Sequence, residues 1–335
     1  MLNAAIIGLG RWGRTLVDSV QKDGNPLGDK LRVGAVVTRT ISDEVRAYAK
    51  AQQLHIASFD EVLADRTIGA VLIATPHSQH GAQIVAAANA GKHVFCDKPF
   101  TLTRVEAEAD FEACRKAGVV LAAGFNRRFL PATQALRAAI GAGKLGRILH
   151  LEAQFSGSSG LTFQPGMWRA SADESPAGGM GAMGIHMVDQ LIWHNGPIAS
   201  VACVSRRQHL DIEMDDTTSM LFRFVNGSTG YLATLTATAR FWRLQALGTK
   251  GWMQLSETDT EHQELGGKNL RQGYDAVDIE RAELEAFATM SGGGPAYPVP
   301  EDEVGHGVSV MEAIARSARE DGAWTVVQRT PPFRN

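Results

Sequence analysis

Short apolar runs alternate with segments of helical periodicity through the first third of the chain. The apolar runs are AAIIG, RVGAVVT, AVLIA, KHVFC and VVLAAG, and helical patterns lie between them, the first ending near Val20 and the others near 42–53, 79–90 and 104–116. Alternation of strand and helix is typical of a doubly wound domain. We therefore predict that residues 1–123 form an α/β domain with a parallel sheet.

The pattern changes after about residue 124. RILHLEAQF alternates apolar with polar side chains, SMLFRF and YLATLTAT flank the turn pair Asn226-Gly227, and RLQALG and WMQLS continue the series of strands. A last helical pattern covers about 302–320, after the loop SGGGPAYPVP. These features predict a second domain, residues 124–335, of the α+β class with an open, mostly antiparallel sheet.

The strand pattern of the predicted second sheet places apolar side chains on one face and leaves the other face open. Strands that alternate apolar and polar residues pack one face on a core and leave the other open. The open face needs cover from a helix layer or from another subunit. We expect a homo-oligomer, a homodimer or homotetramer, formed through that face.

The composition narrows the class of protein. The 335 residues, 44% of them hydrophobic, suffice for two cores, and 33 basic residues against 36 acidic ones give a net charge of -3. Since neither sign forms a long run, we expect neither nucleic acid nor a membrane as a partner. The expected partner is a small neutral or anionic substrate molecule.

The cysteines and the N-terminal segment are typical of a protein from a reducing compartment. Cys96, Cys114 and Cys203 are too few and too scattered for a disulfide framework or a zinc cluster, so we expect them in the core of a protein from a reducing environment. The N-terminal MLNAAIIGLG lacks a basic segment before its short apolar run, and no other stretch approaches the length that crosses a bilayer. We expect a cytoplasmic protein.

A glycine motif, GLGRWG, follows the first predicted strand and opens the first predicted helix. In this context Gly8 allows a tight turn, Gly10 lets a pyrophosphate approach the backbone, and Gly13 lets the helix pack closely on the strand. The motif predicts a dinucleotide-binding Rossmann domain. The alternative is a purely structural glycine turn.

The second predicted strand ends in Thr38, Arg39 and Thr40, where an NAD-binding domain usually carries an acid for the ribose 2′-hydroxyl. An arginine between hydroxyl side chains suits a 2′-phosphate instead, because a guanidinium makes charge-assisted hydrogen bonds to phosphate. We expect NADP as the cofactor, with NAD less favoured. The alternative is that Arg39 is a solvated loop residue.

The third predicted strand runs into ATPHSQH. Thr75 and Pro76 break the chain at the carboxyl edge of the sheet, where ligands bind in such domains. His77 and His80 then face either the cofactor or water. Isolated histidines are more often satisfied surface or core residues, so a cofactor contact and a structural role both stay open.

The next strand ends in Asp97, Lys98 and Pro99 at the same carboxyl edge. A lysine held between an apolar strand and a proline loses freedom and some solvation, which lowers its pKa and leaves a positioned hydrogen-bond donor. The alternative is an ordinary surface lysine.

Six segments together give a family resemblance, and it covers nearly the whole chain. In order they are GLGRWG, ATPHSQH, GKHVFCDKPF, GFNRRFLPA, WRASADESPAGGMGAMGIHMVD and NGSTG. The chain resembles the Gfo/Idh/MocA oxidoreductases, and the acid-Lys-Pro motif is the most specific part. The resemblance implies a Rossmann domain, then an open-sheet domain that carries the substrate pocket. It also implies NAD(P)-dependent oxidation or reduction of sugars, polyols, cyclitols or related hydroxy compounds.

The resemblance also implies site residues. The family's catalytic lysine falls on Lys98 and its catalytic histidine on His186, while Ala182 stands where well-studied members have an aspartate. Asp189 lies three residues after His186, on the same helix face, where it would steady the histidine and contact substrate. Further cofactor contacts are expected in the matching motifs, at Arg11, Trp12, Asn126 and Arg127.

His186 opens a predicted helix after an almost uncharged stretch. Hydride transfer to or from a nicotinamide leaves an alcohol proton to be moved, and an imidazole can take or give it at neutral pH. We expect the glycines before it to keep side chains away from a ligand, namely Gly178, Gly179, Gly181 and Gly184.

Trp168 and Arg169 offer an aromatic wall and a hydrogen-bond fork to a substrate, or else form a domain-interface pair. His186, Asp189 and His194 do not make a metal set, and we expect no metal. A non-catalytic NAD(P)-binding regulator of the same fold is the alternative to an enzyme. Lys98 and His186 argue against the regulator.

Overall fold

A computed structural model describes residues 1–328 of the chain, and these form two compact units. The first unit comprises Met1–Thr101, Val105–Asn126 and Asp278–Glu301. The second comprises Leu102–Arg104, Arg127–Val277 and the chain from Asp302 onward.

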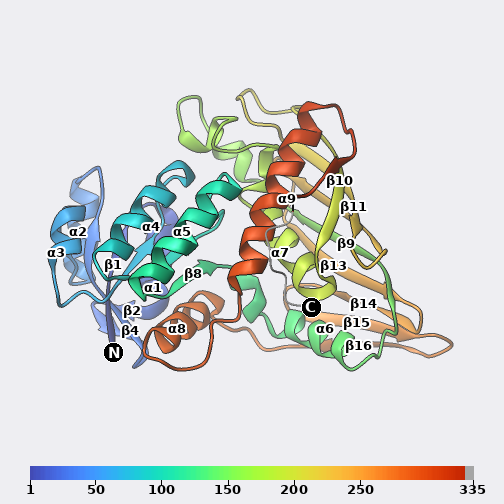
Figure 1. Ribbon diagram of the computed structural model, residues 1–335, viewed down its shortest axis with the longest axis horizontal. Coiled ribbons are helices and arrows are strands. Elements are labelled where there is room, and N and C mark those ends of the chain that lie inside the picture. Colours follow the sequence, from blue (N-terminus) through green and yellow to red (C-terminus); the bar gives the residue numbers. More distant parts are fainter. Residues whose placement is uncertain (329–335) are drawn as a thin grey trace. The chain divides into compact units, whose positions relative to one another are not determined.

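The first unit is built on a six-stranded parallel sheet in the order β5-β4-β1-β6-β7-β8. Most of this unit is the blue and blue-green part of the ribbon in Figure 1. The strands are β1 (Leu2–Ile7), β4 (Leu31–Val37), β5 (His55–Ile56), β6 (Ala70–Ile73), β7 (His93–Asp97) and β8 (Leu121–Gly124). The strand order reverses direction at β1, which pairs with β4 on one side and β6 on the other. The crevice beyond the carboxyl ends of β1 and β6 is therefore where such a sheet binds ligands.

Helices connect these strands as the apolar pattern predicts. They are α1 (Arg11–Val20), α2 (Asp43–Ala51), α3 (Phe59–Ala64), α4 (His80–Asn89) and α5 (Arg104–Ala117). The short elements β2 (Gln21–Lys22), β3 (Asn25–Pro26), β5 and α3 were not predicted, because they are too short to show a period. The predicted parallel α/β domain is confirmed.

The first unit also takes in α8 (Ile279–Ser291), which the boundary predicted at residue 123 assigned to the second domain. This helix packs on α1, β4 and β7. Phe287 is buried with its ring 5.8 Å from that of Phe95, and Arg281 donates a 2.7 Å hydrogen bond to the carbonyl of Ser19. The chain therefore returns to the first unit after the second sheet, which no local pattern indicates.

The second unit has a nine-stranded sheet in the order β16-β15-β14-β13-β9-β12-β11-β10-β17. Its strands are β9 (Ile148–Ser156), β10 (Ile198–Arg206), β11 (Thr217–Phe224), β12 (Thr229–Leu235), β13 (Phe241–Gly248), β14 (Gly251–Leu255), β15 (Asp259–Glu264), β16 (Asn269–Gly273) and β17 (Thr325–Val326). All neighbours are antiparallel except β9 and β12, and Gly227 has φ +87° in the predicted turn between β11 and β12. The predicted mostly antiparallel sheet is confirmed.

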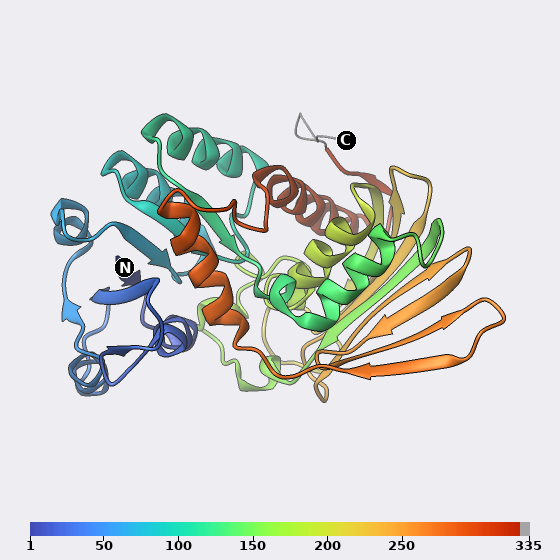
Figure 2. The ribbon, with the colours of Figure 1, turned by 90° about the horizontal axis from the view of Figure 1, so that it is seen from below.

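Helices of the second unit lie on one face of this sheet (Figure 2). They are α6 (Pro131–Gly141), α7 (Gly184–Asn195) and α9 (Glu301–Arg319). α7 packs on β9 and β12, α6 packs on β14 and β15, and Ser317 of α9 accepts a 2.8 Å hydrogen bond from the amide of Cys203. The other face carries Glu152 and Gln245 side by side, together with Leu221, which is 51% exposed.

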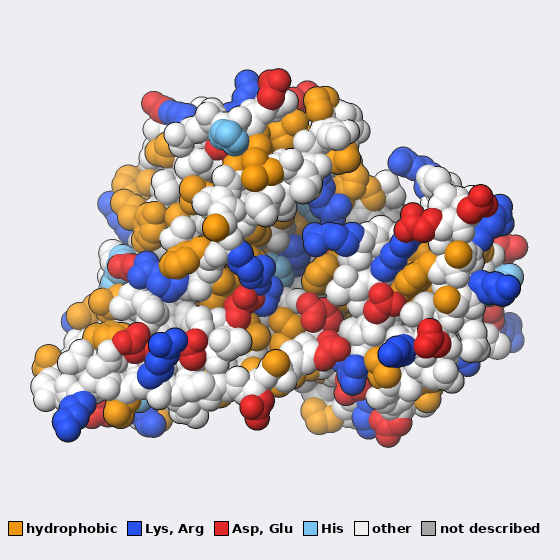
Figure 3. Space-filling view, turned by 180° about the vertical axis from the view of Figure 1, so that it is seen from behind, with side chains coloured by type: hydrophobic (Ala, Val, Ile, Leu, Met, Phe, Trp, Pro, Cys, Tyr) orange, Lys and Arg blue, Asp and Glu red, His pale blue; other side chains and the backbone are white. Residues whose placement is uncertain are grey.

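Two further sequence expectations concern charge and cysteines. Basic and acidic side chains are interspersed over the face shown in Figure 3. The thiols of Cys96, Cys114 and Cys203 are free and buried, as expected of core residues. No helix in residues 1–328 is both long enough and apolar enough to span a bilayer.

Candidate functional site

The glycine turn after β1 has the geometry of a nucleotide cradle. Gly8 has φ +96°, and a Cβ atom there would lie 2.7 Å from the carbonyl oxygen of Ala74. A Cβ atom at Gly13 would overlap the carbonyl oxygen of Gly8, whereas one at Gly10 would have no protein atom within 4 Å. Gly8 and Gly13 are thus required by the turn and by packing, while Gly10 leaves open space over the backbone.

The start of α1 fits a phosphate group. Its N-cap residue, Gly10, provides no side-chain hydrogen bond, and its first turn contains no acid. The indole N–H of Trp12 is buried and has no hydrogen-bond partner within the described chain. Amide donors and the positive end of the helix dipole therefore gather where a dinucleotide pyrophosphate would lie.

Thr38, Arg39 and Thr40 follow β4 directly, at the carboxyl edge of the sheet. Arg39 is exposed and forms no ion pair within residues 1–328. Glu44, in the first turn of α2, is paired with Arg14. Arg39 is therefore the charged group that this edge offers to a phosphate.

His80 is a structural residue, which settles one of the two histidines after β6. It is buried, with Nδ1 3.0 Å from the carbonyl oxygen of Pro99 and Nε2 3.0 Å from that of Thr75. The expectation that His80 faces the cofactor or water is corrected by these contacts. The side chain instead ties the loop after β6 to the loop after β7, so it positions both edges of the crevice.

Lys98 lies directly after β7 and is half-buried. The bond from Lys98 to Pro99 is a cis peptide, and the carbonyl oxygens of Pro99 and Phe100 both face the ring of His80. The backbone next to Lys98 is therefore fixed by contacts within the first unit. Thr75 at the neighbouring strand end donates a 2.7 Å hydrogen bond to Gln83, so its hydroxyl is also oriented.

Asn126 and Arg127, both expected to contact the cofactor, are directed to different partners. Asn126 is buried and donates a 3.0 Å hydrogen bond to Glu280 of α8, while its side-chain oxygen has no partner among the described residues. Arg127 donates a 2.6 Å hydrogen bond to Glu257 of the second unit. Asn126 thus keeps an acceptor for a ligand. Arg127 lies beside Phe155, the ring that also contacts His186, and its contact with a cofactor stays a prediction.

His186 lies in the first turn of α7 and is 5% exposed. Its ring centroid is 6.0 Å from that of Phe155, on β9, which α7 covers. The guanidinium groups of Arg127 and Arg240 each lie 5.4 Å from the Phe155 ring centroid. The ring of His186 thus lies next to that of Phe155, which the guanidinium groups of Arg127 and Arg240 also contact.

The glycines before His186 do not act as expected. A Cβ atom at Gly178, whose φ is +65°, would overlap the carbonyl oxygen of Asp215. At Gly179 it would lie 2.6 Å from Thr236. These positions are glycine because the loop packs tightly against the second sheet and its connections, rather than to leave room for a ligand.

Asp189, on α7, is engaged by a buried arginine. Arg128 donates hydrogen bonds to both of its carboxylate oxygens, from Nη2 at 2.6 Å and from Nε at 3.0 and 3.1 Å, and Gln190 donates a further one. Nη2 of Arg128 also lies 2.5 Å from Glu303. Asp189 therefore anchors α7 instead of contacting substrate or steadying His186.

Burial alone would lower the pKa of Arg128, but the carboxylates of Asp189 and Glu303 raise it, so the guanidinium stays charged. Arg128 is thus a structural centre that the sequence alone did not predict. The doubled arginine of GFNRRFLPA marks it, but nothing in the sequence pairs it with residues 61 and 175 positions away.

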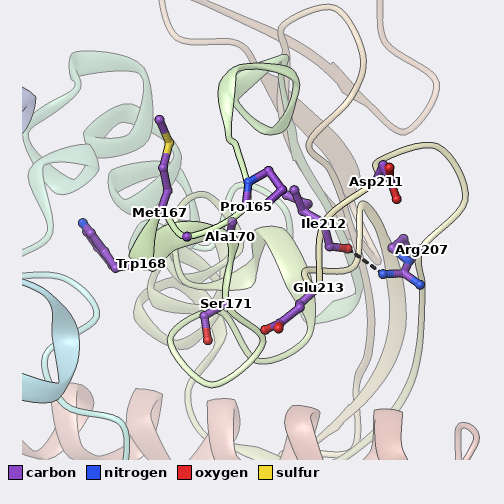
Figure 4. A pocket seen from close by; sticks show the side chains of 10 residues that line it. Pro165, Met167, Trp168, Ala170, Ser171, Arg207, Asp211, Ile212 and Glu213 are labelled. Atoms are coloured by element: carbon purple, nitrogen blue, oxygen red, sulfur yellow. Dashed lines mark hydrogen bonds between the residues drawn. The ribbon is translucent and has the colours of Figure 1, made fainter.

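Trp168 and Arg169 form a stacked pair, with the guanidinium 4.0 Å from the indole centroid. Trp168 also lines a pocket of about 510 Å³, together with residues 165–167, 170–171, 207 and 211–213. Figure 4 shows Trp168 at one end of this pocket and Arg207 with Asp211 at the other. Trp168 thus forms one side of a pocket, with Arg169 stacked on its indole, and a contact of either side chain with substrate stays a prediction.

No group of three or more His, Cys, Asp or Glu side chains within residues 1–328 could hold a metal ion. His194 is buried beside Trp193, with ring centroids 4.9 Å apart, and burial lowers its pKa to about 3. It is therefore a neutral core residue at physiological pH.

Two family models match this chain. Residues 2–125 match the oxidoreductase family with an NAD-binding Rossmann fold, and residues 133–254 match the GFO/IDH/MocA C-terminal domain.

Individual proteins match as well. D-xylose 1-dehydrogenase (NADP(+)) 2 of Haloferax volcanii is 30% identical over 297 residues, which cover 84% of this chain and 88% of the relative. scyllo-Inositol 2-dehydrogenase (NAD(+)) of Bacillus subtilis is 36% identical over 159 residues, or 44% of this chain and 43% of the relative. The crystal structure of aldose-aldose oxidoreductase from Caulobacter crescentus complexed with glycerol shares the fold, with TM-score 0.86, 24% identity and coverage of 97% and 99%.

Proposed function

This chain belongs to the Gfo/Idh/MocA oxidoreductase family, and we propose that it is an NADP-dependent dehydrogenase of aldoses or related polyols. Family membership makes it an NAD(P)-dependent enzyme that transfers a hydride between the nicotinamide and a small hydroxy or oxo compound. The match to the D-xylose dehydrogenase over most of both chains carries the proposal of an aldose.

The preference for NADP is supported by the carboxyl edge of β4. Arg39 is exposed there without an ion-pair partner in the described chain, and the positions beside it carry hydroxyl groups rather than an acid. A guanidinium binds a 2′-phosphate by charge-assisted hydrogen bonds, whereas NAD-specific domains use a carboxylate on the ribose. The relatives themselves are named for NADP in one case and NAD in another.

In this proposal Lys98 acts on the oxygen of the substrate hydroxyl, and His186 acts on its proton. A bound nicotinamide would supply the hydride chemistry at the carbon that bears this hydroxyl. Lys98, on a backbone fixed by His80, donates a hydrogen bond to the reacting oxygen. His186 accepts the hydroxyl proton as the alcohol becomes a carbonyl, and gives it back in the reverse direction.

The reaction is tested by adding D-xylose, and then a panel of aldoses and cyclitols, to the protein with NADP or NAD. The proposal expects nicotinamide reduction with at least one aldose and faster reduction of NADP than of NAD. Tight NADP binding without reduction by any sugar of the panel would favour the non-catalytic regulator, for which Ala182 in place of an acid is the supporting observation.

We also propose a homo-oligomer in a reducing, cytoplasmic compartment. The helices α6, α7 and α9 cover one face of the second sheet, and Leu221 is half-exposed on the other. Burial of that face against a second copy would remove its apolar side chains from water. The three buried free thiols suit a compartment that keeps cysteines reduced.

A further inference from the structure

Two arginines beside His186 share one carboxylate. Glu257, after β14, accepts hydrogen bonds from Nη1 of Arg127 at 2.6 Å and from Nη2 and Nε of Arg240 at 2.5 and 3.2 Å. One carboxylate thus holds two guanidinium groups.

The other arginine clusters of the second unit are balanced differently. Arg128 is bound by two carboxylates, and its side chain is 1% exposed, so that cluster is closed to a ligand. Arg243 has a single carboxylate partner, Glu152, at 2.7 Å. Arg240, in contrast, shares its carboxylate, and its side chain is 58% exposed.

The ring of Phe155 contacts both of these arginines and also His186 of the proposed reaction site. Arg127 and Arg240 each lie 5.4 Å from its ring centroid, and the ring of His186 lies 6.0 Å from the same centroid. Two guanidinium groups are therefore one aromatic ring away from the imidazole. Glu257 fixes their orientation, and Nη1 of Arg240 forms no hydrogen bond within the described part of the chain.

We propose that Arg240, with Arg127, forms a subsite for a carboxylate on the substrate, so that a sugar or polyol that carries a carboxylate binds more tightly than its neutral counterpart. A guanidinium offers five N–H donors in a planar fork that matches a carboxylate. Glu257 uses part of this fork and leaves the exposed part to a ligand. The inference rests on the proposed function for the identity of the reacting site, but its own claim concerns binding.

A purely structural role is the competing explanation. In that case the two arginines only flank Phe155 by cation–π contacts, and Glu257 only holds them in place. Such a role predicts no difference between charged and neutral ligands of the same shape. A binding comparison separates the two explanations.

The test measures calorimetric binding of D-gluconate and D-glucitol to the NADP-loaded protein, since the two ligands share their carbon chain and hydroxyl pattern and differ in the carboxylate. We expect gluconate to bind at least about tenfold more tightly, the range of a charge-assisted hydrogen bond. Arg240→Gln should bring the two affinities within about twofold. Arg240→Lys should keep part of the preference. Arg115→Gln, on the exposed face of α5, is the control and should leave it unchanged.

Equal or tighter binding of glucitol, no binding of either ligand, or a preference that survives Arg240→Gln would overturn the inference. The outcome is separate from that of the proposed function. Turnover of neutral sugars without a gluconate preference would leave the dehydrogenase standing and remove the subsite. A gluconate preference without hydride transfer to or from any sugar would do the reverse.

Discussion

Arg128 donates hydrogen bonds to both carboxylate oxygens of Asp189, from Nη2 at 2.6 Å and from Nε at 3.1 Å. Asp189 lies three residues beyond His186 on the same helix. The guanidinium also binds Glu303 and lies 5.2 Å from the ring centroid of Trp193. These contacts fix α7 against the segment after β8 and against α9. The orientation of His186 therefore depends on a buried ion cluster that does not itself take part in proton transfer.

Removal of Arg128 should strongly destabilise the protein. Arg128→Met leaves Asp189 buried without its cation, and breaking a buried pair in this way costs about 3–5 kcal/mol. Urea denaturation measures the change in the free energy of unfolding. Arg115→Met on the exposed face of α5 is the control, with an expected change within about 0.5 kcal/mol. A loss below about 1 kcal/mol for Arg128→Met would show that Asp189 finds another partner.

Asp110, on α5, makes stability depend on pH. Burial, and to a smaller degree Glu106, raises the pKa of Asp110 to about 7. Because the folded state holds this proton more tightly, the contribution is complete below the unfolded pKa of about 3.9 and is lost as pH rises through about 7.

Asp110→Asn should remove this dependence. The variant should match the natural protein in unfolding free energy near pH 4 and exceed it near pH 8, where the natural carboxylate is charged. Thermal unfolding at the two pH values measures the difference. A variant that is less stable than the natural protein near pH 8 would contradict the assignment of a buried, proton-holding carboxyl.

Arg39→Asp should reverse the cofactor preference. It replaces a guanidinium that suits a 2′-phosphate by a carboxylate that repels it and accepts from a ribose hydroxyl, so NADP affinity should fall by about tenfold or more. Fluorescence titration with NADPH and NADH measures both affinities. Arg66→Asp, in the loop before β6, is the control. Equal affinities for the two cofactors in the unaltered protein would contradict the preference.

The open face of the second sheet should hold two subunits together. Leu221→Arg places a charge on that face and should shift the oligomer toward monomer in sedimentation experiments at micromolar concentration. Leu265→Arg, at an 85% exposed position after β15, is the matched control and should leave the oligomer intact. A natural protein that sediments as a monomer would contradict the proposal.

The main strands and the glycine turn could be predicted because each depends on local order. The run AVLIA predicts β6 by itself, and Gly10 has the open space that its motif requires. α8 could not be assigned to the first unit, because its partners Ser19 and Phe95 lie far away in the sequence.

The same limit applies to the candidate site. Lys98 and His186 stand in motifs, whereas the partners of His80, Asp189 and Arg127 are set by contacts between distant segments. A residue type and its position in a helix indicated where Asp189 would lie. They did not indicate which cation would bind it.

The rate of hydride transfer in a single turnover tests the central claim most directly. With NADP and the best aldose of the panel, Lys98→Met and His186→Ala should each slow nicotinamide reduction by about a hundredfold or more, because each removes a group that acts on the reacting oxygen or its proton. NADP affinity should stay within about twofold, and Lys116→Met on α5 should behave as the natural protein. Transfer at the natural rate in either site variant, or NADP binding without hydride transfer in the natural protein, would contradict the account.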